Sequence, residues 1–411
     1  MSDHEVRAIR DEEIGDYLRC LSTAFHHGTE ATEEHVAFAR HYMNDLSRRL
    51  GAFVDGALRG TAGSFGADLT VPGGRTVPMA AVTQVTVLPT HRRRGLLREM
   101  MQTQLHDSLA RGELVAMLLA AEWPIYGRFG YGMATEAANT IVDVSTAEFR
   151  DSAPPGSIEV VDLATLRAVA PEPFDRHRLM TPGAITREPV MWDLSLGVLR
   201  WPGDDPPKHR VRVVHRDPAG AVDGYAVYDP IDEWVYNRPM VKLDVVELIA
   251  ATDAAWVDLW RYLCAIDWVS EVRARVRAVD EDLRPLFVDG RVARQADRSD
   301  NMWVRLLDVP AALAARRYEV PVSIVLEVQD DIFGGGTYRL EGDADDATCA
   351  PTDEPADVAL NVDVLGAAYL GGSPLAPYVP AGRVDELTSG SVAVLDRALR
   401  TARAPWATTG F

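Results

Sequence analysis

The segment 84–101 constrains the fold of this chain more than any other, because it joins an extended run to a helix through a short cationic turn. A β-branched run over 85–87 predicts a strand, Pro89 ends it, and leucines and methionines at helical spacing over 96–101 predict a helix. A strand that leads through a tight turn into a helix is a building unit of α/β folds. We therefore expect alternating strands and helices.

The turn itself, Arg92 to Gly95, has the composition of an anion site. The first N–H groups of a helix have no partner within the helix, and the helix dipole is positive there, so a phosphate is stabilised at that end. Gly95 allows close approach of the backbone, and three consecutive arginines add fixed positive charge to a chain of net charge −19. A solvated helix start is the alternative interpretation of a lone RxxG motif.

The length and the charge balance exclude several classes of protein. A chain of 411 residues exceeds the usual size of one hydrophobic core, and 47% hydrophobic with 25% charged residues is typical of a globular protein. The acidic excess disfavours nucleic acid and anionic membranes and favours cationic partners. The charged N-terminus lacks a secretory signal, and the three cysteines lack disulfide or metal-ligand spacing. We expect a cytoplasmic protein without a metal.

Hydrophobic periodicity and proline-rich breaks divide the chain into predicted helices, strands and a linker. Helical spacing predicts two opening helices within 11–50, β-branched runs predict antiparallel strands over 51–90, and the apolar run 115–120 predicts a strand buried on both faces. Helical spacing continues over 90–111. Paired prolines in 151–157 predict a linker.

The rest of the chain again alternates strand and helix. A hairpin is expected over 211–230, a helix over 254–265, and a strand, a Pro-started helix and another strand between 301 and 330. The three units expected from these patterns are residues 1–150, 151–298 and 299–411.

A second informative segment, WPIYGRFGYGMA (123–134), follows the buried strand at 115–120. Its GxxGxG spacing differs from the GxGxxG that opens a helix in dinucleotide-binding folds, so a Rossmann site is excluded. Phe129 is expected to be a core aromatic. Tyr126 is a candidate functional residue.

These two segments, the start of the third unit (NMWVRLLDVPAAL) and the aromatic C-terminus together resemble the enhanced intracellular survival (Eis) family of actinobacterial GCN5-related N-acetyltransferases. The resemblance covers essentially the whole chain. It implies an α/β (α+β) fold with two fused acetyltransferase-like domains and a C-terminal sterol-carrier-like domain, assembled as a homohexamer. It also implies acetyl transfer from acetyl-CoA to amines, notably those of aminoglycosides, and hence antibiotic resistance.

The resemblance assigns roles residue by residue. The backbone of Val85, Thr86 and Val87 matches the pantetheine contact, and Ala121 and Glu122 match the last acetyl-CoA contact. Tyr126 matches the general acid, and the terminal carboxylate of Phe411 matches the general base. The residues matched to the pyrophosphate are Arg92, Arg93, Arg94, Gly95, Leu96, Leu97 and Arg98, with Leu97 standing where the family usually has Gly or Ala.

The central unit lacks a comparable turn. Its RxxG, Arg200 to Gly203, is followed at once by Asp204, Asp205 and two prolines, so no helix can start there and a phosphate would be repelled. We therefore predict one acetyl-CoA site per chain, in the first unit.

The assigned chemistry is consistent with the residue types. A tyrosine, with an ordinary pKa of about 10, can protonate a departing thiolate, whereas an α-carboxylate, with an ordinary pKa of about 3.5, needs burial to become a useful base. Other interpretations stay open: an acetyltransferase acting on protein lysines, N-termini or polyamines, or a non-enzymatic ligand carrier. The sequence does not decide whether five further residues line a cleft or lie on the solvated surface. They are His26, His27, Glu30, Glu33 and Glu34.

Overall fold

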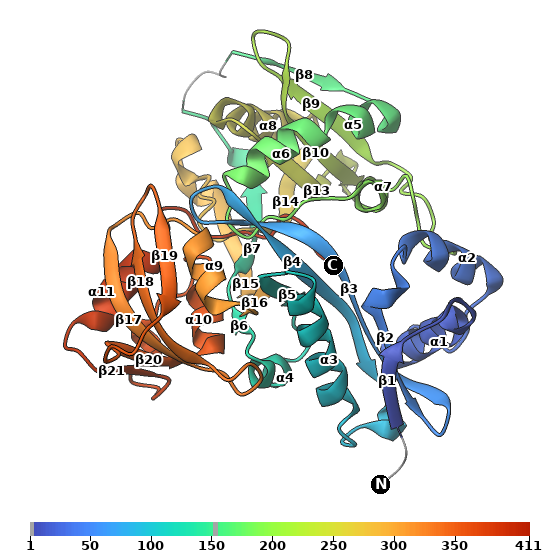
Figure 1. The fold of residues 1–411 in the computed structure, drawn as a ribbon. Coiled ribbons are helices and arrows are strands. Elements are labelled where there is room, and N and C mark those ends of the chain that lie inside the picture. The colour runs from blue at the N-terminus through green and yellow to red at the C-terminus, as the bar shows by residue number, and fades with distance from the viewer. Residues whose placement is uncertain (1–3, 151–154) are drawn as a thin grey trace.

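The computed structural model describes residues 4–150 and 155–411. These residues form three large sheets with helices packed against them, and Figure 1 shows the first sheet at the lower right, the second at the top and the third at the left. The expected α/β fold is confirmed.

The first sheet positions the cationic turn. Its strands, in order across the sheet, are β1 (His4–Ala8), β2 (Arg49–Val54), β3 (Ala57–Val71), β4 (Arg75–Val87), β5 (Val115–Leu119), β16 (Met302–Leu306) and β6 (Gly132–Met133). Strands β2, β3 and β4 are antiparallel, as expected, and β4 and β5 are parallel. The helices of this part are α1 (Ile14–Ala24), α2 (Glu33–Tyr42), α3 (Leu96–Ala110) and α4 (Trp123–Tyr126).

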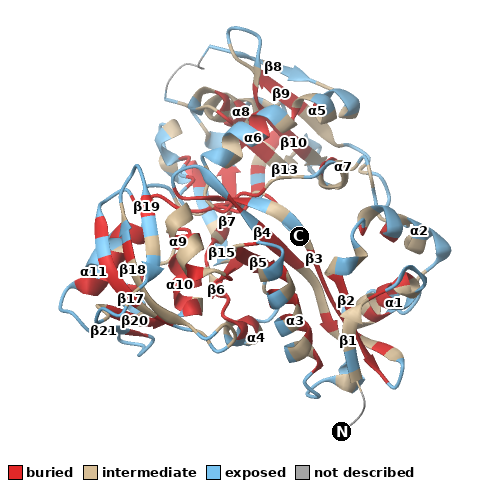
Figure 2. Ribbon diagram, viewed as in Figure 1, coloured by how far each residue is buried: buried red, intermediate tan, exposed pale blue. Residues whose placement is uncertain are grey.

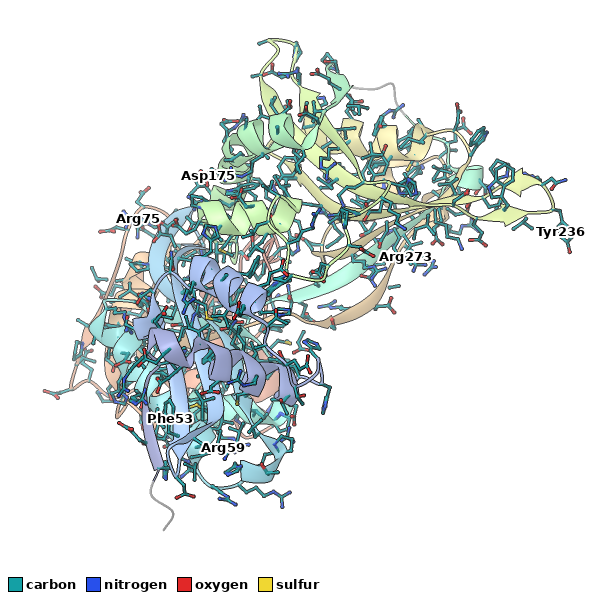
Figure 3. All side chains as sticks on the ribbon, turned by 90° about the vertical axis from the view of Figure 1, so that its right-hand side faces the viewer. Phe53, Arg59, Arg75, Asp175, Tyr236 and Arg273 are labelled. Carbon is teal, nitrogen blue, oxygen red and sulfur yellow. The ribbon has the colours of Figure 1, made fainter. Side chains whose placement is uncertain are left out.

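The second sheet repeats this arrangement. Its strands, in order, are β15 (Ala293–Asp300), β7 (Glu136–Asp143), β14 (Val269–Ala278), β13 (Val241–Ala250), β10 (Val222–Ile231), β9 (Val211–Arg216) and β8 (Ser157–Val160). Helices α5 (Leu163–Val169), α6 (Pro171–Leu179) and α7 (Pro189–Leu196) precede β9, and α8 (Asp253–Ala265) joins β13 to β14. Strands β11 (Trp234–Val235) and β12 (Arg238–Pro239) form a projecting hairpin, and Figure 3 shows Tyr236 at its tip, far from the body of the molecule.

The third sheet belongs to the C-terminal part of the chain. Its strands, in order, are β19 (Ala347–Pro351), β18 (Gly336–Gly342), β17 (Val322–Gln329), β20 (Val358–Asn361) and β21 (Val384–Glu386). Its helices are α9 (Val309–Ala315), α10 (Val362–Ala368) and α11 (Ser391–Leu399). One hydrophobic cluster joins this sheet to the first one, with Met79 and Val304 on one side and Leu326 and Leu365 on the other.

The first two sheets exchange strands. β7 directly follows β6 in the chain but pairs in the second sheet, and β16 directly follows β15 but pairs in the first. The two crossings meet, because the backbone N–H groups of Ala134 and Thr135 donate to the carbonyl of Met302, each at 3.0 Å, and the N–H of Asn301 donates to the carbonyl of Thr135 at 2.9 Å. The first two sheets are therefore linked by two chain crossings that hydrogen-bond to each other.

The middle of the first sheet is buried on both faces. Along β4, Met79 and Ala81 face the cluster shared with the third sheet, whereas Ala80 and Val82 face the cluster under α3. This follows from the two-residue period of a strand. Figure 2 shows β4, β5 and β10 as largely buried. The expectation of a doubly buried strand at 115–120 is confirmed for 115–118, whereas Leu119 is exposed.

Two elements differ from the sequence-based expectation. The chain opens with strand β1 rather than with helices, and α3 begins at Leu96 because Gly95 has a left-handed backbone. The bounds at 150 and 298 stay predictions. The sheets themselves mix segments from both sides of these positions, since β7 lies before 150 and pairs in the second sheet, and β16 lies after 298 and pairs in the first. Such exchange leaves no local sequence signal. Of the linker expected at 151–157, residues 151–154 lie outside the described part.

A single methyl group tests the docking of the third unit on the first sheet. A Cβ at Gly132 in β6 would overlap the carbonyl oxygen of Asp363 in α10, whereas a Cβ at Gly127 would lie 3.9 Å from Oδ2 of the same residue, an ordinary van der Waals contact. We expect Gly132→Ala to lower the free energy of unfolding by roughly 3 kcal/mol. The measurement is urea denaturation beside Gly127→Ala, and equal stability of the two variants would contradict this packing.

Candidate active site

Strands β4 and β5 separate before they end. They pair in parallel only over Met79–Ala81 and Val115–Met117, although β4 continues to Val87. The pairing of β4 with β3 is irregular at the same place, where Gln84 has a φ of 57°. Beyond the paired region, β4 has backbone groups on its β5 side that no ladder to β5 uses, and these groups are available to an extended ligand.

The turn after β4 forms an anion site from backbone and side chains. Arg93 and Gly95 have φ values of 63° and 87°, and no side-chain hydrogen bond caps the start of α3 at Gly95. Space is free around Gly95, so its conformation rather than crowding requires a glycine. The helix therefore presents unpaired N–H groups at its positive end.

The arginines of the turn are not neutralised. Arg92, Arg93, Arg94 and Arg98 are exposed, and none forms an ion pair with a carboxylate in the described ranges. The pKa of the neighbouring His91 is lowered, first by partial burial and then by the positive charges of Arg94 and Arg59. The turn is thus a local positive region on an acidic protein.

One cleft of about 760 Å³ collects the residues that the sequence singled out. It is lined by every residue expected to contact acetyl-CoA: Val85, Thr86, Val87, Arg92, Arg93, Arg94, Gly95, Leu96, Leu97, Arg98, Ala121 and Glu122. Tyr126 lines the same cleft. Segments that are distant in sequence meet there because β4 and β5 are neighbours in the sheet.

Tyr126 lies at the end of α4 with a protonated hydroxyl. Its side chain is 8% exposed, and burial together with the negative charge of Glu122 raises its pKa to about 12. The ring meets that of Tyr131 edge-on at 6.1 Å and packs in the cluster under α3. A neutral phenol at the wall of a cleft can donate a proton at any physiological pH.

The loop that carries Tyr126 is supported from β16 and the third unit. The guanidinium of Arg305 in β16 lies directly under Gly130 and pairs with Asp330, which precedes the turn between β17 and β18. Phe333 in that turn packs against the same cluster as Tyr126. Two segments more than 170 residues away in the chain therefore fix the shape of this loop.

The chain end approaches the cleft from the other side of β4. The ring of Phe411 is half-buried and meets Phe65 of β3 edge-on at 5.4 Å. Phe65 is the strand partner of Ala81, which is the last β4 residue paired with β5. The terminus thus lies one strand away from the point where β4 and β5 separate, in agreement with the position of the C label in Figure 1. Phe411 itself does not line the cleft around Tyr126.

The structure adds residues that the sequence could not assign. His26, at the end of α1, lines the cleft, whereas His27, Glu30, Glu33 and Glu34 are exposed and do not. Phe129 is buried, as expected for a core aromatic, and also lines the cleft. No local signal identifies the end of α1, because only the packing of α1 against β3 and β4 brings it there. The remaining additional lining residues are Ala24, Phe25, His91, Ile125 and Arg128.

The described residues contain neither a membrane-spanning helix nor a cluster of metal-ligating side chains. No helix among them is long and apolar enough to span a membrane. No group of three or more His, Cys, Asp or Glu side chains in the same ranges is arranged to hold a metal ion.

Family models match all three parts of the chain. An Acetyltransferase (GNAT) domain matches residues 5–134, a second one matches residues 183–319, and a Sterol carrier protein domain matches residues 309–408. The order of domains implied by the resemblance is confirmed.

Relatives of known name cover most of the chain. It is 40% identical over 409 residues to an uncharacterised N-acetyltransferase of Streptomyces griseus, covering 98% of both chains. It is 38% identical over 341 residues to the N-acetyltransferase Eis of Mycobacterium tuberculosis, covering 80% of both. The crystal structure of Eis1 from Mycobacterium abscessus superposes with a TM-score of 0.86 at 33% identity, covering 99% of this chain and 100% of that one. By these measures and by its domain order, the chain belongs to the Eis family of GCN5-related N-acetyltransferases.

Proposed function

We propose that this enzyme transfers the acetyl group of acetyl-CoA to amino groups of small molecules that carry several amines, such as aminoglycosides. The observation that carries the proposal is the single cleft lined by the end of β4, the arginine–glycine turn and Tyr126. A thioester of a pyrophosphate-containing cofactor requires an anion site at its pyrophosphate and a proton donor at its sulfur, and free strand groups can align the arm between them. The start of α3, the phenol of Tyr126 and the end of β4 would meet these three needs.

Different residues of the cleft would bind different parts of acetyl-CoA. The N–H groups at the start of α3 and the unpaired arginines would hold the pyrophosphate, and β4 over 85–87 would align the pantetheine arm. A ligand fixed at both places has its thioester directed toward Tyr126, so the reacting atoms are held together before the chemical step.

Two groups would move the protons. The hydroxyl of Tyr126, which is protonated at neutral pH with either its ordinary pKa or the raised value of about 12, would donate to the departing thiolate. The terminal carboxylate of Phe411 would accept a proton from the attacking ammonium, directly or through water. Acetyl transfer to an ammonium breaks the C–S bond, forms a C–N bond and removes two protons from the nitrogen. One proton would leave through the carboxylate of Phe411 to water before the attack. The second, lost from the nitrogen after the attack, would replace the proton that Tyr126 gives to sulfur.

The charge of the protein favours a cationic acceptor. A net charge of −19 attracts amines of multiple positive charge and raises their encounter rate in a salt-dependent way. The cytoplasmic location expected from the charged N-terminus stays a prediction. So does the homohexamer that the family resemblance implies.

A panel of acceptors tests the substrate class. Thiol release from acetyl-CoA would be followed with aminoglycosides, spermidine and lysine-containing peptides, with mass spectrometry counting the acetyl groups added. Turnover with aminoglycosides well above that with the other amines is expected. A preference for polyamines or peptides would overturn the aminoglycoside assignment, and absence of acetyl-CoA binding in calorimetry would point to a non-enzymatic carrier.

The turn is tested by placing a carboxylate in it. Gly95→Asp should weaken acetyl-CoA binding by roughly 100-fold or more, because the aspartate repels the pyrophosphate at the helix start. Gly112→Asp is the matched control: Gly112 also has a positive φ and free space and lies just beyond the other end of α3, away from the cleft. Calorimetric titration measures both, and equal affinities would refute the assignment of the turn.

The general acid is tested by removing one oxygen atom. Tyr126→Phe should lower kcat by roughly 100-fold or more while leaving the Kd for acetyl-CoA within a few fold. Tyr131→Phe serves as control, since the hydroxyl of Tyr131 is buried without a hydrogen-bond partner among the described residues. Steady-state kinetics at pH 7 decide, and an unchanged kcat for Tyr126→Phe would remove this residue as the acid.

The terminal base is tested by extending the chain. Two glycines added after Phe411 convert its carboxylate to an amide, so kcat should fall roughly 100-fold without a change in melting temperature. The same two residues added at the N-terminus are the control. Full activity of the C-terminally extended enzyme would contradict a role for the carboxylate.

A further inference from the structure

The second sheet contains a counterpart of the gap between β4 and β5. Strands β13 and β14 are its parallel pair and are joined through α8, as β4 and β5 are joined through α3. They pair from Val241 to Val245 and then separate, although β13 continues to Ala250. The central unit therefore keeps the strand geometry of a cofactor site.

Side chains of the protein bind backbone groups of this second gap, at the wall of a cleft of about 590 Å³. Arg277 of β14 donates from Nη1 to the carbonyl of Leu248 in β13 at 2.8 Å, and its charge is balanced by Glu281. The indole Nε1–H of Trp406 donates to the carbonyl of Val276 in β14, also at 2.8 Å. Backbone groups of the diverging strands are thus occupied by side chains, one of which belongs to the C-terminal tail.

Trp406 is held by contacts of its ring and of its backbone. It is 6% exposed, the guanidinium of Arg277 lies 4.6 Å from its ring, and the ring of His177 meets it edge-on at 5.7 Å. Its backbone N–H donates to the carbonyl of Pro182 at 2.8 Å. The tail is therefore fixed in the central unit five residues before its end.

Arg187 holds the next part of the tail. Its Nε–H donates to the hydroxyl of Thr409 at 2.8 Å, and its Nη2 donates to the backbone carbonyl of Thr408 at 3.1 Å. Both contacts lie two or three residues before the terminal carboxylate. Small movements of the arginine would therefore be passed on to that carboxylate.

Arg187 is itself rigid. Its side chain is 3% exposed, pairs with Glu247 at 2.6 Å and lies over the rings of Phe174 and Trp192 at 4.2 and 4.9 Å. The backbone just before it continues onto β3, where the N–H of Thr186 donates to the carbonyl of Asp68 at 3.0 Å. Arg187 thus lies at the junction between the central unit and the strand that carries Phe65.

We propose that the central unit uses its former cofactor gap to anchor the C-terminal tail, and that Arg187 is a positioning residue for the terminal carboxylate of Phe411. The second part rests on the proposed role of that carboxylate as the base. The first part does not, because it concerns only where the tail is held.

The positioning role is tested with two isosteric changes. Thr409→Val removes the hydroxyl that Arg187 holds and should lower kcat roughly tenfold at an unchanged KM for acetyl-CoA. Thr408→Val keeps its backbone carbonyl and loses a hydroxyl that has no partner among the described residues, so its kcat should stay within twofold of that of the unaltered enzyme. Equal kcat values for the two variants would overturn the positioning role.

A double variant separates positioning from general stability. If Thr409 acts through the carboxylate, Thr409→Val should have almost no further effect in the enzyme extended by two glycines after Phe411. Multiplying effects would indicate a structural role and overturn the proposal. If the extension alone leaves kcat unchanged, the terminal base of the proposed function fails, and the positioning role fails with it.

The anchor has its own readout, independent of activity. Trp406→Leu should speed the release of Thr408 and Thr409 by carboxypeptidase Y at least tenfold, followed by mass spectrometry below the melting temperature. Trp234→Leu, an exposed tryptophan on the projecting hairpin, is the control and should leave the rate unchanged. Equal release rates for the two variants would overturn the anchoring of the tail.

Discussion

The separation of β4 from β5 is the constraint on which the active site depends. Two parallel strands that remained paired to their ends would use each other's backbone groups and close the sheet over the cleft. The pairing instead stops at Ala81, and an irregularity at Gln84 accompanies the separation. The turn at Gly95 then starts α3 beside the gap, so that the dipole of the helix and the open strand edge serve one ligand.

The same separation in the second sheet has a different outcome because of side chains. Arg277 and Trp406 donate to carbonyl groups of the diverging strands, and Arg277 is buried in an ion pair with Glu281. The same strand arrangement therefore leaves the end of β4 open in the first unit, whereas side chains bind the corresponding strand carbonyls in the central one. Strand exchange through β7 and β16 couples the two units, so the contacts of Trp406 in the central unit can determine where the end of the chain lies.

Much of the first unit could be predicted because its signals are local. Residues 84–101 contain their strand, turn and helix in one continuous run, and the buried strand β5 is readable from its apolar sequence. The sequence patterns do not predict β1, because a five-residue edge strand of mixed polarity has no clear hydrophobic period. The support of the Tyr126 loop by Arg305 and the approach of His26 depend on packing between distant segments, which no local pattern encodes.

The sequence by itself determined the α/β character, the cationic turn and the family to which the chain belongs, because each rests on residue types at short spacing. Only the tertiary structure decided which strands share a sheet, that Tyr126 and the turn line one cleft, and that the chain end returns to β3 beside them. Strand partners and the path of a tail are chosen by the total free energy of packing. That energy sums contacts between residues hundreds of positions apart and is therefore not contained in any one segment.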